Sequence, residues 1–93
     1  MNITIRAFWE FNKCLQDVGA RVDGGYPTFF LCSDGEALSF QAAKESADMV
    51  RDAIITDDKR SGWHVCGMAV NWEDPELYCS HTGEHIEPAY AEN

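Results

Sequence analysis

The stretch TFFLCSDGEALSF, residues 28–40, limits the possible folds of this chain more than any other part of the sequence. Asp34-Gly35 is a dipeptide typical of two-residue type I′ hairpin turns, and aromatic and aliphatic residues flank it on both sides. The alternating positions on the two strands are occupied by Phe30, Cys32, Leu38 and Phe40. The pattern predicts an antiparallel hairpin, and therefore a sheet with at least one face to bury.

Two amphipathic segments accompany this hairpin. Residues 4–18 are predicted as a helix ending at Gly19, because apolar side chains recur at helical spacing: Ile5, Phe8, Phe11, Leu15 and Val18. A short strand over residues 3–6 is the alternative for its start, since that stretch alternates and is β-branched. A second helix is predicted over residues 41–55, with an apolar stripe of Ala43, Ala47, Val50 and Ile54.

A further strand is predicted in WHVCGMAVNW, residues 63–72, after a polar loop. Its more apolar set is expected to face the core: His64, Cys66, Met68, Val70 and Trp72. LYCS, residues 77–80, is a candidate edge strand. The order of elements predicts an α+β fold, with a small, mostly antiparallel sheet and two helices packed on one face. Residues 1–93 form one domain, and residues 80–93 are expected to be an irregular acidic tail.

Charge points to the class of partner. Sixteen acidic residues against seven basic ones give a net charge of −9, which repels phosphate backbones and attracts basic protein surfaces. We therefore expect a basic protein or a nucleoprotein complex as partner and no direct contact with nucleic acid. A purely solubilising role of the charge is the alternative.

Two groups of carboxylates are the candidate partner-binding residues. Helical spacing places the first group, Glu45, Asp48 and Asp52, on one stripe of the second predicted helix. The second group, Glu73, Asp74 and Glu76, begins a stretch that contains no lysine or arginine. Aromatic residues accompany it, which suits docking onto arginine-rich surfaces.

The sequence gives less support to a membrane protein, a secreted protein or an enzyme. No apolar run approaches the roughly 20 residues of a membrane span, and the first residues do not resemble a secretion leader, so a cytoplasmic protein is expected. The four cysteines form no CxxC pair and are expected to stay reduced. No serine-hydrolase, phosphate-loop or HExxH motif occurs, and we expect no catalysis. Monomer and homodimer both remain open.

A possible metal site lies near the C-terminus. Cys79, His81 and His85 offer one thiolate and two imidazoles at short spacing, and Cys66 could add a fourth zinc ligand. A second closely spaced pair, which most structural zinc sites contain, is missing. We expect no cofactor and a metal-free tail packed by Ile86 and Tyr90, and a small zinc-stabilised regulatory or structural module is the alternative.

The same tail carries a resemblance. The pattern C-x-H-C-G-x-x-I-x-x-A-Y occurs in small bacterial and phage-borne proteins, and this sequence matches it at Cys79, His81, Gly83, Ile86, Ala89 and Tyr90, with Thr82 in place of the second cysteine. Together with its small size and acidity, this chain resembles the anti-CRISPR and related anti-defence proteins of phages and mobile elements. The resemblance implies inhibition by binding in the host cytoplasm, at the basic DNA- or guide-binding surface of a CRISPR effector. It assigns no individual functional residue.

Overall fold

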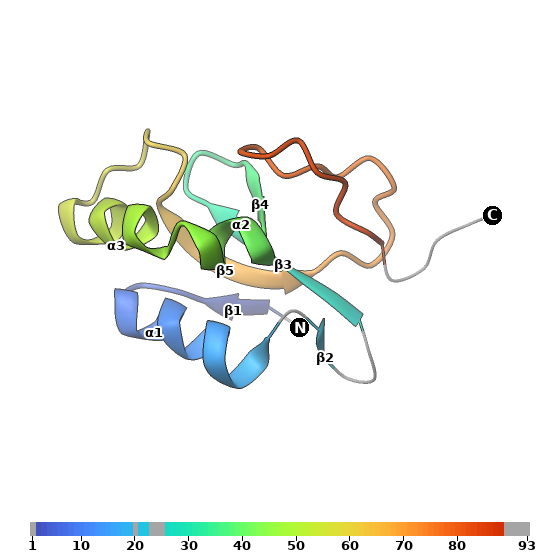
Figure 1. Ribbon diagram of the computed structural model, residues 1–93, viewed down its shortest axis with the longest axis horizontal. Helices are drawn as coiled ribbons and strands as arrows, with labels where there is room; N and C mark the ends of the chain where they lie inside the picture. The colour runs from blue at the N-terminus through green and yellow to red at the C-terminus, as the bar shows by residue number, and fades with distance from the viewer. Residues whose placement is uncertain (1, 20, 23–25, 89–93) are drawn as a thin grey trace.

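A computed structural model describes residues 2–19, 21–22 and 26–88 of the chain. The elements follow one another as β1 (Asn2–Thr4), α1 (Phe8–Lys13), the π-helix η1 (Cys14–Val18), β2 (Arg21–Val22), β3 (Tyr26–Cys32), β4 (Ala37–Ser39), α2 (Phe40–Glu45), α3 (Ala47–Thr56) and β5 (Val65–Val70). Figure 1 shows them together with the long irregular stretch after β5. The predicted α+β class is confirmed.

The sheet is antiparallel throughout and is built around β3. One side of β3 pairs with β5, which in turn pairs with β1. The other side of β3 pairs with β2 near its start and with β4 near its end. The first strand of the chain therefore lies at one edge of the sheet, and β4 lies at the opposite edge.

The helices pack on the face of the sheet that carries Phe30. Phe30 lies opposite both Leu38 and Met68 in the register, and all three side chains are buried. The ring of Phe30 contacts Phe11 of α1 at 5.0 Å and stacks on Phe40 of α2 at 5.9 Å between centroids. This aromatic cluster joins both helical segments to one core, as the predicted one-sided helix layer requires.

The start of the chain differs from the favoured prediction. Residues 4–18 do not form one helix, because Asn2–Thr4 pairs with β5 and the α-helix begins only at Phe8. The carboxylate of Glu10 accepts hydrogen bonds from the N–H groups of Arg6 and Ala7 (2.9 and 3.1 Å), which fixes this start. The end at Gly19, with a φ of 80°, is as predicted.

The hairpin is confirmed, but its turn is not type I′. Gly35 has a φ of 87°, whereas Asp34 is not among the residues with positive φ. Gly35 N–H donates to Cys32 O and Cys32 N–H donates to Glu36 O, both at 3.0 Å. The loop is therefore a type I turn followed by a left-handed glycine, one residue longer than predicted.

The second predicted helix is divided into two. Ser46, with φ −113° and ψ 34°, separates α2 from α3. Helix α2 buries Ala42 and Ala43, and helix α3 buries Val50 and Ala53. Ser39 caps α2 by accepting the N–H of Ala42 at 3.1 Å. The helical phase that would align Glu45 with Asp48 and Asp52 is therefore interrupted.

The fifth strand contains an irregularity that changes which residues face the core. Its pairing with β3 shifts between Leu31 and Cys32, so that Val65 lies opposite Cys32 and is buried. Met68 and Val70 face the core as predicted, whereas Cys66 is only partly buried. Residues 77–80 form no strand, and Tyr78 forms an isolated bridge with His85.

Candidate functional site

The stretch after β5, residues 71–88, is called here the C-terminal segment. It contains neither helix nor strand, yet Asn71, Cys79 and Ile86 are almost completely buried. Asn71 Nδ2 donates to the carbonyl oxygens of Asp74 (2.9 Å) and Ile86 (3.0 Å), and Asn71 Oδ1 accepts from Asp74 N–H (3.1 Å). One buried side-chain amide thus fastens both ends of the segment.

The segment also closes the outer edge of β4. Ser80 N–H donates to Ala37 O at 2.9 Å, and the N–H of Ser39 donates to the sulfur of Cys79. The backbone N–H and C=O groups of Ala37 and Ser39 point away from β3, because Leu38 forms the hydrogen-bonded pair with Phe30. The irregular segment is therefore docked onto the sheet by backbone bonds.

Cys79 lies in a tight turn that directs donors at its sulfur. Gly83, with a φ of 73°, returns its N–H to Cys79 O at 2.9 Å. Burial alone raises the pKa of this thiol, but hydrogen bonds from Ser39 N–H, the Thr82 hydroxyl and the N–H groups of Thr82 and His81 outweigh burial and lower the pKa to about 7. By contrast, burial and the nearby Asp34 raise the pKa of Cys32 to about 12.

The structure does not gather the proposed zinc ligands. The His81 ring packs against Trp63 at 4.5 Å between centroids, whereas His85 Nε2 lies 2.8 Å from Pro75 O. Within residues 2–19, 21–22 and 26–88, no three His, Cys, Asp or Glu side chains are grouped so that they could hold a metal ion. Cys66 lies on β5, whereas the turn that contains Cys79 lies beside β4. Of the predicted packing residues, Ile86 is buried, while Tyr90 lies outside the described residues.

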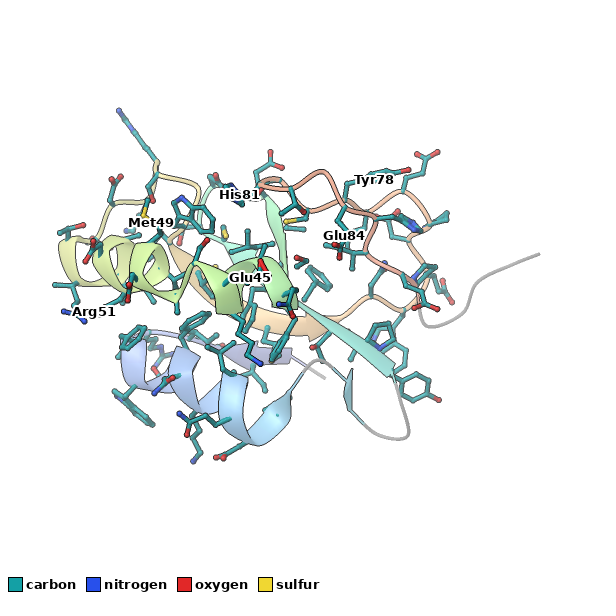
Figure 2. The ribbon with its side chains drawn as sticks, in the orientation of Figure 1. Glu45, Met49, Arg51, Tyr78, His81 and Glu84 are labelled. Carbon is teal, nitrogen blue, oxygen red and sulfur yellow. The ribbon has the colours of Figure 1, made fainter. Side chains whose placement is uncertain are left out.

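The carboxylates of the segment are all on its surface. Glu73, Asp74 and Glu76 are exposed in the first turn, and Glu84 and Glu87 are exposed after the Cys79 turn. Large aromatic surface accompanies them, since Tyr78 is 54% exposed and Trp72 38%. Figure 2 shows Tyr78 and Glu84 on the same lobe, at a distance from Arg51 of α3. The segment presents anionic and aromatic groups without a lysine or arginine among them.

A groove of about 220 Å³ separates this segment from β3, β4 and α2. The residues that line it are Pro27, Thr28, Ser39, Phe40, Gln41, Glu84, His85, Ile86 and Glu87. Gln41 also donates from Nε2 to Glu45 Oε1 at 3.0 Å, although Glu45 itself does not line the groove. Sequence spacing could not predict this grouping, because its two walls are more than forty residues apart in the chain.

The remaining predicted carboxylates lie elsewhere. Asp48 and Asp52 are exposed on α3 and are one helical turn apart, so they share one side of that helix. Glu45 ends α2, where its carboxylate accepts a hydrogen bond from Gln41. The predicted stripe of three is therefore divided between the end of α2 and α3.

A hydrogen-bonded Ser–His–Asp chain lies at the far end of the hairpin. Ser33 Oγ is 2.7 Å from His64 Nδ1, and His64 Nε2 is 3.0 Å from Asp57 Oδ1. Ser33 N–H also donates to His64 O at 2.9 Å, so the chain ties the hairpin turn to the loop before β5. None of these three residues lines the groove beside the C-terminal segment.

Comparisons with known proteins identified no relative. No family model, no curated protein and no solved structure matches this sequence. In the part of the chain that the structure describes, none of the helices has the length and apolar character required to cross a membrane.

Proposed function

We propose that this chain is a non-catalytic binding protein that docks its acidic C-terminal segment on the basic, nucleic-acid-binding surface of a nucleoprotein complex. The observation that supports this proposal most directly is that the segment is acidic and anchored at once. Buried Asn71, Cys79 and Ile86 fix the backbone, while the carboxylates around them stay exposed. An anchored surface loses little conformational entropy on binding.

The groove beside the segment suits a long basic side chain. Phe40, Pro27 and Ile86 supply apolar surface for its methylene groups, and Glu84 supplies a carboxylate for its charged end. Arginine fits this combination better than lysine because its planar guanidinium can form paired hydrogen bonds with a carboxylate. The walls of the groove come from two parts of the fold, so its shape depends on the folded protein.

The class of partner follows from charge and from the resemblance. A net charge of −9 disfavours binding to phosphate and favours the surfaces that nucleic-acid-binding proteins present to phosphate. The resemblance to anti-CRISPR proteins makes a guide-loaded CRISPR effector complex the first partner to test. Binding there would exclude DNA by occupying its site.

The test compares charge-reversed variants for binding to a purified, guide-loaded effector complex. Changing Glu73, Glu76 and Glu84 to lysine should raise the dissociation constant by about 100-fold. Asp74 is kept because its Oδ1 accepts the N–H of Glu76 at 3.0 Å and shapes the turn. Reversal of Glu45, Asp48 and Asp52 should have a smaller effect, since none of the three lines the groove.

A matched control separates local docking from total charge. Glu36, Asp48 and Asp52 are exposed and do not line the groove, and their reversal changes the net charge by the same amount. This control should bind within a few-fold of the wild type, and raising salt from about 0.05 to 0.5 M should weaken only wild-type and control binding. Equal binding by all variants, or failure of the wild type to compete with target DNA, would contradict the proposal.

A further inference from the structure

The edge of the sheet opposite the C-terminal segment is open. β1 pairs with β5 on one side, and no strand among the described residues pairs with its other side. Ile5 N–H donates to Cys66 O at 2.9 Å, so by alternation Ile3 also faces β5 and the backbone groups of Asn2 and Thr4 point outward. The strand contains neither a charge nor a proline, the residues that usually protect an exposed edge.

An apolar groove of about 260 Å³ lies beside this edge. Its lining comes from β1, α1 and η1: Ile3, Trp9, Glu10, Lys13, Cys14, Asp17 and Val18. Trp9 is 67% exposed, although an indole of this size usually finds a partner in a folded protein. The groove borders η1, and π-helical turns are frequent at functional sites.

Charge distinguishes this region from the rest of the molecule. Residues 1–22 contain three basic and two acidic residues, whereas the remaining residues contain four basic and fourteen acidic ones. The groove carries Lys13 between Glu10 and Asp17, so both signs alternate along its rim. A surface of this kind can face a copy of itself without the repulsion that a net charge of −9 imposes elsewhere.

We propose that a second copy of this chain docks on β1, with the two β1 strands antiparallel about a two-fold axis. The outward N–H and C=O groups of Thr4 would then pair across the axis and join the two sheets into one. Both helix layers would lie on the same face, so that Trp9 of each copy covers the apolar groove of the other. Three strand residues provide few hydrogen bonds, and the burial of Trp9 must provide most of the affinity.

The geometry favours a second copy over an unrelated partner. A two-fold interface requires a surface that is complementary to itself, and the mixed charges of Glu10, Lys13 and Asp17 meet this requirement. The acidic C-terminal segment lies at the other edge of the sheet, beyond β4, as Figure 1 shows. The dimer would therefore hold its two most negative surfaces at opposite ends.

The test measures mass in solution by sedimentation velocity from about 1 to 100 µM protein. The wild type should reach twice the chain mass of 10.5 kDa. Trp9→Glu should raise the dimer dissociation constant at least about tenfold, because it places a charge in the apolar interface. Thr4→Pro should act in the same direction, since it removes the outward N–H while proline is tolerated on edge strands.

The control is Met49→Glu, which adds the same charge at a side chain that is 50% exposed on α3. This variant should dimerise like the wild type, and circular dichroism should show a native spectrum for all three variants. A wild type that stays monomeric at about 100 µM, or a dimer unaffected by Trp9→Glu in a folded variant, would overturn the proposal. Neither result depends on the nucleoprotein partner, so this proposal and the proposed function can fail separately.

Discussion

The sheet-and-helix body, residues 2–70, and the C-terminal segment share one hydrophobic core but are held to it by different interactions. The body is joined by ladders of backbone hydrogen bonds and by large side chains such as Phe11, Phe30 and Met68. The segment contributes Leu77, Cys79 and Ile86 to the core and relies on the amide of Asn71 and on bonds to β4. Regular elements thus provide stability in the body, whereas a few specific contacts give the segment its shape.

This difference implies unequal tolerance to mutation. In the body, one lost contact leaves many parallel ones, because each strand is paired along its length. In the segment, single residues serve two or three connections each. Removing one such residue should therefore disturb the conformation of the whole segment. The segment's surface carries the proposed binding site.

Ile86→Ala tests the hydrophobic anchor and should have the largest effect. Ile86 is 5% exposed, and its truncation should lower the free energy of unfolding by about 2–5 kcal/mol if the segment unfolds with the body. Urea denaturation followed by circular dichroism measures this change. Ile55→Ala on α3, at a residue 66% exposed, should cost less than about 0.5 kcal/mol. Equal effects would show that the segment is not part of the cooperative core.

Asn71→Ala tests the polar anchor. The change removes three hydrogen bonds and leaves the buried carbonyl of Ile86 without its donor, which should cost about 2 kcal/mol. Asn12→Ala, at an exposed position on α1, provides the control and should be nearly neutral. Urea melts of both variants measure the difference, and similar midpoints would remove Asn71 as an anchor.

Gly35→Val tests the turn that closes the body's central hairpin. A β-branched residue is strained at a φ of 87°, so the variant should be less stable by about 1 kcal/mol or more. No heavy atom lies within 4 Å of the position that a β-carbon would occupy, so the cost arises from the backbone alone. Glu36→Ala is the neighbouring control. If Gly35→Val unfolds at the same urea midpoint as the wild type, Gly35 does not have the positive φ described for this turn.

The thiol of Cys79 predicts a pH dependence specific to the segment. Its pKa in the folded protein, about 7, lies below the ordinary value of 9.0. The thiolate is therefore favoured by folding, and this contribution to stability is complete above about pH 9 and is lost as the pH falls through 7. Thermal melts from pH 6 to 9 should show stability rising more steeply in the wild type than in Cys79→Ala. Parallel profiles would contradict the proposed hydrogen bonding at the sulfur.

Chelation should have the smallest effect of all. Because the imidazole rings of His81 and His85 contact Trp63 and Pro75, excess EDTA should leave the thermal midpoint unchanged. A large decrease that zinc reverses would instead support the zinc-stabilised module, since structural zinc contributes directly to folding. Metal analysis of the purified protein provides the independent readout.

The sequence predicted the body far better than the segment, for a physical reason. Strands and helices repeat their environment every two or about 3.6 residues, so Phe30, Leu38, Val50 and Met68 could be placed from periodicity. The break at Ser46 and the bulge at Cys66 escaped prediction, because tertiary pairing overrides local pattern at both places. At the start of the chain, pairing with β5 decided between helix and strand.

The candidate site was predicted only in part. The exposure of Glu73, Asp74 and Glu76 followed from composition, whereas their anchoring by Asn71 did not. Nothing in the spacing connected Gln41 with Glu84, because these residues line one groove only when the segment docks beside α2. Contacts between distant parts of the chain leave no periodic signal in either part.

The bonds from Ser80 and Cys79 to β4 have a consequence for the behaviour of damaged chains. They cover the outer edge of β4, so a dimer formed through β1, as proposed above, would not add further strands at this edge. A chain shortened before Asn71 would expose the edges of both β1 and β4, each able to accept another strand. Head-to-tail addition without closure produces filaments, so proteolysis of the segment should convert a self-limiting protein into a polymerising one.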